Sequence, residues 1–249
     1  MTDQVLVADE AGVRTIRMHR PEKKNALTQP MYEAMTQALR EAAANEAIRC
    51  IVLAGTPGAF CAGADIGEFA EAAQSGGLRP KTLEFLHALA RNPKPLVAAV
   101  GGIAVGIGTT LLLHCDYVVA AGDAVLATPF SRLGLVPEAA SSLLAPLRMG
   151  HARAFALLVM GRPLSAAAAK EAGIVNEVVE PGAVDAVALK AAHDIAALPP
   201  GAVAVSRALL RGELDDVARR IDTEAMHFRE RLQSAEARGA FAAFLSRRK

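Results

Sequence analysis

The chain has 249 residues, of which 52% are hydrophobic and 21% charged, a balance typical of a globular protein with a sizeable core. Its 27 basic and 26 acidic residues leave a formal net charge of +1, so no overall field would hold it on nucleic acid or on an anionic membrane. An anionic ligand must therefore be bound by a local cluster of groups.

The cysteines and the apolar segments indicate the compartment. Cys50, Cys61 and Cys115 are widely spaced and form no CxxC pair, and the first residues lack the features of a signal peptide. The longest apolar stretch, residues 95–113, is interrupted by glycines, which favours buried strand, turn and helix over a membrane span. We expect a cytoplasmic protein with no transmembrane segment.

Strands and helices alternate through most of the chain. In the first half we predict strands over residues 5–7 and 13–18, a helix over 29–45, a strand over 50–54, a glycine-rich loop through 63, helices from 65 and over 80–92, and a strand over 96–100. In the second half we predict a helix over about 106–114, strands over 117–120 and 125–127, helices over 150–160 and 166–171, and a strand over 175–179. This alternation predicts an α/β fold.

The composition changes after residue 183, where the pattern becomes purely helical and a long amphipathic, arginine-rich stretch starts at Leu214. We therefore divide the chain into a core over residues 1–195 and a C-terminal helical subdomain over 196–249. The subdomain could equally be an assembly surface.

Two glycine-rich segments could carry chemistry. In each of them, residues 59–66 and 101–108, a strand runs through glycine into a predicted helix, whose first N–H groups have no partner within the helix. Two such turns can face one oxygen atom and stabilise negative charge on it. Taken alone, glycine-rich turns before helices are more often structural than functional.

A resemblance to a known family gives these segments a role. The sequence His19-Arg-Pro-Glu-Lys-Lys-Asn-Ala-Leu27, the segment Ala62-Gly-Ala-Asp65 and residues 95–116 resemble, in order and spacing, the motifs of the crotonase (enoyl-CoA hydratase/isomerase) family. The resemblance extends over nearly the whole chain. It implies a crotonase-like ββα spiral core with a C-terminal helical subdomain, and an acyl-coenzyme A thioester as substrate.

The resemblance also implies the site residues. It places the N–H groups of an oxyanion hole at Ala64 and Ile107. It places the coenzyme A site at Lys24, Ala26, Ala62, Ala64, Asp65 and Ile66. At Ile107 the family usually has glycine, so the β-branched side chain must point away from the substrate while its backbone N–H remains a donor.

The positions of the carboxylate side chains indicate which reaction of the family to expect. The two glutamates of the family's hydratases correspond here to Thr110 and Phe130, neither of which can transfer the required proton. Glu138 lies nearby as the one charge in a loop of apolar and small residues, and residues 127–150 resemble the Δ3,Δ2-enoyl-CoA isomerase branch, whose catalytic glutamate falls at Glu138. The resemblance thus implies isomerisation of a 3-enoyl-CoA to a 2-enoyl-CoA in fatty acid β-oxidation.

Other readings remain open at this point. Another reaction of the same family, hydration or isomerisation of a ring-derived acyl-CoA, would use the same oxyanion hole, and a non-catalytic acyl-CoA-binding subunit would make Glu138 incidental. We expect no metal and no cofactor, because coenzyme A is part of the substrate. His114, Cys115 and Asp116 are interpreted as packing or capping residues, and the acyl tail is expected around residues 67–89. The family resemblance implies a trimer or a dimer of trimers.

Overall fold

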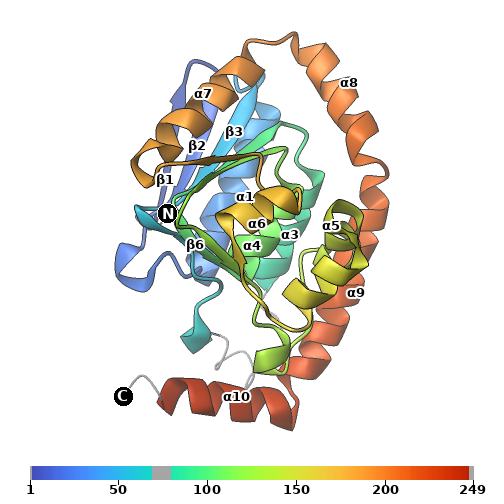
Figure 1. Cartoon of the computed structure of the whole chain (residues 1–249). Helices are drawn as coiled ribbons and strands as arrows, with labels where there is room; N and C mark the ends of the chain where they lie inside the picture. The colour runs from blue at the N-terminus through green and yellow to red at the C-terminus, as the bar shows by residue number, and fades with distance from the viewer. Residues whose placement is uncertain (1, 69–79, 247–249) are drawn as a thin grey trace.

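Two β-sheets organise the structure (Figure 1). The computed structural model describes residues 2–68 and 80–246. The larger sheet has six strands in the order β1-β2-β3-β5-β7-β10, in which β1 and β2 form an antiparallel hairpin and the remaining neighbours are parallel. Its strands are β1 (Val5–Glu10), β2 (Val13–Met18), β3 (Cys50–Ala54), β5 (Leu96–Val100), β7 (Tyr117–Ala121) and β10 (Glu177–Val179).

The second sheet has four short strands in the order β4-β6-β8-β9. These are β4 (Gly58–Cys61), β6 (Gly102–Val105), β8 (Val125–Ala127) and β9 (Leu164–Ser165). In each of the pairs β3/β4, β5/β6 and β7/β8, the first strand belongs to the larger sheet and the second to the smaller one. This repeat is the turn of the predicted spiral. The glycine-rich loop predicted through residue 63 was wrong in part, because it contains β4, and β6 forms in residues for which no separate strand was predicted. Glycines weaken the strand pattern there, but the parallel pairing of β4 with β6 makes both segments strands.

Helices lie on both sides of the larger sheet. The helix α7 (Val184–Ala196) packs across β2, β3, β5 and β7, while α1 (Gln29–Ala44) packs with α3 (Pro80–Arg91) and touches β1 and β2. The apolar runs of β3 and β5 are buried along their whole length, as expected for strands covered on both faces. No helix of the described residues is both long enough and apolar enough to span a membrane.

Shorter helices differ from the predicted ones. The single helix expected over residues 106–114 is a turn of α-helix, α4 (Ile107–Thr110), followed by a 3-10 turn, η2 (Leu111–His114). The next helix, α5 (Ser141–Leu158), begins nine residues before its predicted start and is kinked at Gly150, which has a φ of 77°. Beyond it lies α6 (Ala166–Glu171), as predicted. The helix expected from residue 65 falls largely outside the described residues.

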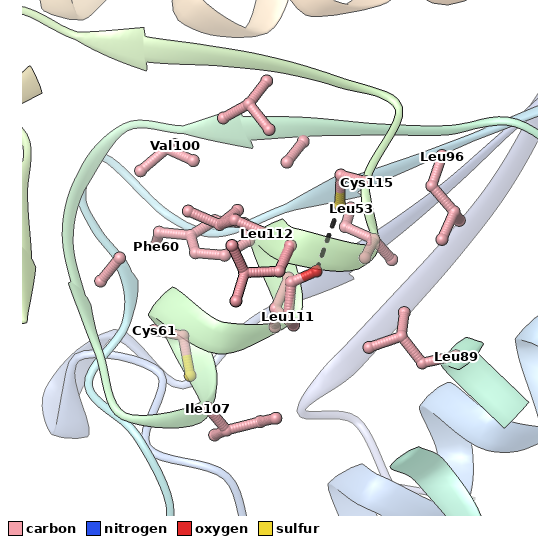
Figure 2. Close-up of a cluster of buried hydrophobic side chains, with 14 of the residues drawn as sticks. Leu53, Phe60, Cys61, Leu89, Leu96, Val100, Ile107, Leu111, Leu112 and Cys115 are labelled. Atoms are coloured by element: carbon pink, nitrogen blue, oxygen red, sulfur yellow. Dashed lines mark hydrogen bonds between the residues drawn. The ribbon is translucent and has the colours of Figure 1, made fainter. Parts of the chain in front are cut away.

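The hydrophobic core continues from the larger sheet to the second glycine-rich turn (Figure 2). Leu53 of β3, Leu96 of β5 and Leu111 of η2 are fully buried in one cluster. Figure 2 shows Ile107 at the lower edge of this cluster, below Cys61. The start of α4 is therefore anchored in the core rather than carried on a free loop.

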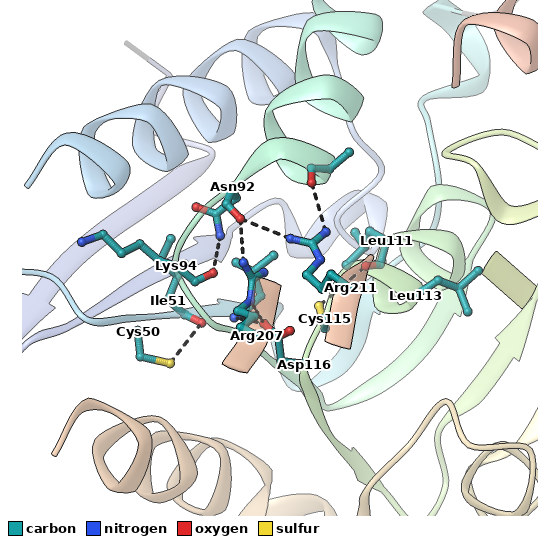
Figure 3. A network of polar contacts seen from close by, with 12 residues as sticks. Cys50, Ile51, Asn92, Lys94, Leu111, Leu113, Cys115, Asp116, Arg207 and Arg211 are labelled. Carbon is teal, nitrogen blue, oxygen red and sulfur yellow. Dashed lines mark hydrogen bonds and ion pairs between the residues drawn. The ribbon is translucent and has the colours of Figure 1, made fainter. Parts of the chain in front are cut away.

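Three helices complete the C-terminal region: α8 (Pro200–Arg211), α9 (Leu214–Leu232) and α10 (Ala235–Ser246). In Figure 1, α8 and α9 run along one side of the molecule and α10 crosses its lower end. Figure 3 shows how α8 is attached. The guanidinium of Arg207 donates to Asp116 at 2.7 Å and to the carbonyl of Asn92 at 2.8 Å, and Arg211 donates to the carbonyls of Asn92 and Ala90. Asp116 thus has a structural role: it pairs with Arg207 and also accepts a hydrogen bond from the N–H of Leu96.

Candidate active site

A cavity of about 470 Å³ lies beside the two glycine-rich turns. Its wall includes Ala62, Ala64 and Ile66 from the first turn, Ile107 from the second, and Glu138. Most of the remaining lining is apolar. The cavity therefore brings together both predicted N–H donors and the predicted carboxylate.

The backbone around Ala64 leaves its N–H free. Leu27 pairs with Ala64 in a parallel bridge, in which Leu27 donates to the carbonyl of Gly63 and the N–H of Asp65 donates to Leu27. These bonds use the groups on either side of Ala64. No described residue accepts a hydrogen bond from the N–H of Ala64. A donor without a partner at the wall of a cavity can bind an oxyanion.

The second donor comes from the first residue of α4. Gly106, with a φ of 54°, donates its own N–H to the carbonyl of Ala127 and turns the chain into the helix. No acceptor among the described residues takes the N–H of Ile107, as expected for the first position of a helix. The side chain of Ile107 is 4% exposed and belongs to the hydrophobic core. This burial is compatible with an Ile in place of the family's glycine.

Glycine allows the two turns to approach closely. A Cβ atom on Gly108 would lie 2.5 Å from the carbonyl oxygen of Cys61, which is inside any normal contact distance. A Cβ atom on Gly63, whose φ is 94°, would lie 3.1 Å from the carbonyl oxygen of Val105. The absence of side chains at both positions therefore sets the separation of the two N–H donors.

Among the described residues that line the cavity, Glu138 is the one that carries a carboxyl group. Burial among apolar side chains raises the pKa of Glu138 to about 8, with a further contribution from the negative charge of Glu224, while a hydrogen bond from Thr110 lowers it. Part of the side chain remains open to the cavity. A carboxyl with a pKa near neutrality, beside two oxyanion donors, can act as a general base and then as a general acid.

The two positions that correspond to hydratase glutamates are also at the site. Thr110 is fully buried and its hydroxyl hydrogen-bonds to Glu138, and Phe130 lines the cavity with 6% exposure. Neither side chain can hold and release the proton of an attacking water.

The residues predicted to bind coenzyme A fall into two groups. One group, Ala62, Ala64 and Ile66, lines the cavity. The other group, Lys24, Ala26 and Asp65, does not line it but lies next to the first glycine-rich turn. The main chain connects the groups, since the N–H of Ala62 donates to the carbonyl of Lys24 at 2.9 Å. The ammonium group of Lys24 lies on an exposed side chain, where it can meet an anionic ligand.

An ion pair that the sequence analysis did not foresee supports this region. The guanidinium of Arg20 donates to Asp65 at 2.7 Å and to the carbonyl of Ala26 at 3.0 Å. Asp65 also accepts from the N–H of Gly67 at 2.9 Å, and together these donors lower its pKa even though burial alone would raise it. Asp65 therefore fastens residues 65–67 to the segment that carries Ala26.

Other parts of the cavity wall were missed as well. Tyr32 of α1 lines the cavity, as do Thr82 and Leu86 of α3, which lie within the range expected to hold the acyl tail. Residues 69–79 of that range lie outside the described residues. The far wall is formed by α9 and α10 through Ile221, Ala225, Phe228, Ala240 and Ala243. Helices expected at an assembly surface thus enclose the cavity of their own chain.

The two sheets and the C-terminal helices define a crotonase-fold protein, and comparisons with known proteins give the family. A family model described as Enoyl-CoA hydratase/isomerase matches residues 8–249. The 1,2-epoxyphenylacetyl-CoA isomerase of Escherichia coli is 32% identical over 100% of this chain and 97% of that protein. Enoyl-CoA delta isomerase 2 of Rattus norvegicus is 35% identical over 98% of this chain and 64% of its own length.

Solved structures agree with this assignment. Pseudomonas aeruginosa OdaA superposes with a TM-score of 0.94 at 41% identity, covering 98% of this chain and 99% of that one. An enoyl-CoA hydratase/isomerase from Pseudoalteromonas atlantica superposes with a TM-score of 0.93 at 38% identity, covering 99% and 98%. The chain belongs to the enoyl-CoA hydratase/isomerase family and is an enzyme of that family.

Proposed function

We propose that the protein isomerises 3-enoyl-CoA to 2-enoyl-CoA, with Glu138 as the proton carrier. The observation that carries the proposal is the composition of the cavity: Glu138 lines it together with Ala64 and Ile107, whose N–H groups have no acceptor among the described residues, while Thr110 and Phe130 occupy the hydratase positions. A single carboxylate suffices for a reaction that only moves a proton. Hydration would need a second group to activate water.

The proposed reaction balances without a co-reactant. The carboxylate of Glu138 takes a proton from C2 of the 3-enoyl thioester, and the electron pair is delocalised onto the thioester oxygen and, through the C3–C4 double bond, onto C4. The N–H groups of Ala64 and Ile107 stabilise the resulting dienolate, each donor contributing on the order of 3 kcal/mol. Glu138 then returns its proton to C4, which leaves the double bond between C2 and C3. We propose that coenzyme A enters only as part of the substrate.

The ionisation of Glu138 gives the reaction its expected pH dependence. The carboxylate form must start the cycle, and burial raises the pKa of Glu138 to about 8. We expect kcat/KM to increase with pH up to about 8 and then level off. The apolar wall should also exclude the water that could add to the product.

The first experiment is a paired spectroscopic assay of wild type and Glu138→Gln. Appearance of the conjugated thioester is followed on a 3-enoyl-CoA, and its disappearance on a 2-enoyl-CoA. Conjugation that is lost in Glu138→Gln, without hydration, supports the isomerase. Hydration that persists in the variant would exclude Glu138 as the reacting group. If wild type binds both substrates without reaction, the non-catalytic acyl-CoA-binding role is favoured.

A ring-derived acyl-CoA is the second candidate substrate. The Escherichia coli relative named above acts, by its name, on 1,2-epoxyphenylacetyl-CoA, and its similarity covers 100% of this chain. The cavity wall offers aromatic and aliphatic side chains, among them Tyr32 and Phe130, that could contact a ring. Product analysis after incubation with straight-chain and ring-derived acyl-CoA substrates separates the two.

We further propose a cytoplasmic trimer or dimer of trimers. Free thiols at all three cysteines suit a reducing compartment. The outer face of α8 carries Val205, Leu209 and Leu210 at 63%, 80% and 88% exposure, which suits contact with a second copy. Light scattering of the purified protein gives the mass of the assembly, and a monomer would contradict the proposal.

A further inference from the structure

The loop that carries Glu138 has an unusual backbone. Ala139 and Ala140, the next two residues, have φ values of 60° and 55°. Left-handed conformations are uncommon for residues other than glycine and each costs free energy, so two in succession persist only where the surroundings hold them. The direction in which Glu138 enters the cavity depends on this turn.

A buried glutamate from α9 holds one side of the turn. The carboxylate of Glu224 accepts from the N–H of Ala140 at 2.6 Å through Oε2 and from the N–H of Ser142 at 2.9 Å through Oε1. These amides belong to the N-cap and the second residue of α5, and a negative group is favourable at the N-terminus of a helix. Because both oxygens accept, the ionised carboxylate is the form that fits. Glu224 is 6% exposed.

A histidine from η2 holds the other side. Nε2 of His114 lies 2.7 Å from the carbonyl oxygen of Ala139, to which it must donate. Burial lowers the pKa of His114 to about 4, so the ring is neutral at physiological pH. His114 therefore supports the turn without adding charge, and Glu224 supplies the charged contact.

We propose that Glu224 is a positioning residue that fixes Glu138 in the cavity by binding the main-chain N–H groups of Ala140 and Ser142. This inference rests on the proposed role of Glu138. Glu224 lies outside the cavity lining, and it acts through the loop rather than on the substrate. Its contribution is to hold a backbone conformation that alanine does not favour.

The charges around the pair give the proposal a second readout. Tyr32 of α1 and Cys61 of β4 face Glu138, but burial raises the pKa of both, so they stay neutral. The charge of Glu224 raises the pKa of Glu138. Burial also raises the pKa of Glu224 itself, against the opposing effects of its N–H donors and of Arg220 on the same helix. Removing this charge should move the acidic limb of the rate profile to lower pH.

The experiment compares Glu224→Gln with Glu230→Gln, the same change at an exposed position of the same helix. In Glu224→Gln one N–H acceptor becomes a donor. We expect the plateau kcat on a 3-enoyl-CoA to fall about 10- to 100-fold with KM unchanged, because small misplacements of a reacting group have effects of this size. The acidic limb should shift downward. Glu224→Asp keeps the negative charge, but its shorter side chain moves the carboxylate away from the two N–H groups. The rate should therefore fall, while the acidic limb of the pH–rate profile stays closer to that of wild type. This variant also carries the test if Glu224→Gln does not fold.

Amide hydrogen exchange provides a readout that needs no activity. We expect the N–H groups of Ala140 and Ser142 to exchange at least about tenfold faster in Glu224→Gln than in wild type or Glu230→Gln. Unchanged exchange rates would show that Glu224 does not bind these two N–H groups. Faster exchange together with a wild-type kcat and an unshifted acidic limb of the pH–rate profile would overturn the positioning role. If wild type does not isomerise, the proposed function fails, and the exchange rates still decide whether Glu224 holds the turn.

Discussion

The hydroxyl of Thr110 hydrogen-bonds to the carboxyl of Glu138, so that a side chain from α4 and one from the loop before α5 meet at the active site. The same hydroxyl lies 3.3 Å from the carbonyl oxygen of Gly106. It can therefore donate to Glu138 when that group is ionised, and to Gly106 when Glu138 carries the proton. Thr110, which stands at the first hydratase position, can thus hydrogen-bond to Glu138, the carboxyl group proposed to transfer the proton in this protein.

Replacing this hydroxyl should change the pH dependence. The hydrogen bond from Thr110 lowers the pKa of Glu138, so Thr110→Val should raise that pKa and move the acidic limb of kcat/KM to higher pH. For a hydrogen bond contributing about 1 kcal/mol, activity at pH 7 should fall about fivefold. Rate profiles of Thr110→Val and of Thr110→Ser, which keeps the hydroxyl, provide the measurement. Identical limbs in both variants would contradict the role of the hydroxyl.

The buried carboxyl should also make stability depend on pH. The pKa of Glu138 is raised from 4.5 in the unfolded chain to about 8, so its favourable contribution is fully present below 4.5 and is lost as pH rises through 8. The variant Glu138→Gln has no carboxyl to ionise at this position, so it should not lose stability in this way at high pH. Because Glu138 is only partly buried in the substrate-free enzyme, where solvent can reach part of its charge, we expect the variant to gain about 1–2 kcal/mol at pH 9, or a few degrees in Tm. Thermal unfolding of both proteins from pH 5 to 9 tests this, and a constant difference in Tm would refute it.

The close approach of the two turns can be tested at Gly108. An added Cβ would clash with the carbonyl of Cys61, so Gly108→Ala should push α4 away from β4 and separate the N–H groups of Ala64 and Ile107. We expect a loss of about 1–3 kcal/mol in stability and a fall in kcat of at least about tenfold. Gly122→Ala is the matched control, since its Cβ would meet no atom closer than 3.7 Å. Equal kcat in the two variants would show that the separation of the donors is not critical.

The ion pair between Arg20 and Asp65 should affect binding more than turnover. Asp65→Asn removes the charge that holds Arg20 and loosens the segment beside Ala26, so KM should rise about fivefold for a loss of about 1 kcal/mol while kcat changes little. Asp9→Asn breaks the comparable pair with Arg14, which lies in the hairpin β1–β2. Steady-state kinetics of both variants decide the matter. A fall in kcat with unchanged KM would place Asp65 in a different role.

Much of the fold could be predicted because its signals are local. The strands β3 and β5 are short apolar runs with glycine or proline at their ends, and they were predicted at their observed bounds. Glu138 also stood out locally as a single charge in an apolar loop. The strands β4 and β6 could not be recognised in this way. Their regular structure comes from pairing with each other, and a glycine in a short segment more often signals a turn.

The enclosing helices show the limit of local patterns. An amphipathic helix has the same sequence signature whether its apolar stripe covers the active site or another subunit, so the pattern of α9 could not indicate its partner. One signal was present. Glu224 falls on the stripe formed by Val217, Ile221 and Phe228, at helical spacing, and a carboxylate on a buried face needs donors nearby. The sequence alone could not name those donors, which lie 82 and 84 residues away.

The proposed oxyanion donors at Ala64 and Ile107 are main-chain groups, and this has an evolutionary consequence. A point mutation can replace any side chain but leaves an N–H in place at every residue except proline. The charge-stabilising half of the chemistry is therefore inherited with the backbone, while the proton-transferring half is free to vary at a few facing positions. On the proposed function, Ile107 in place of the family's usual glycine and the combination of Thr110, Phe130 and Glu138 are changes of side chain that leave these N–H groups in place.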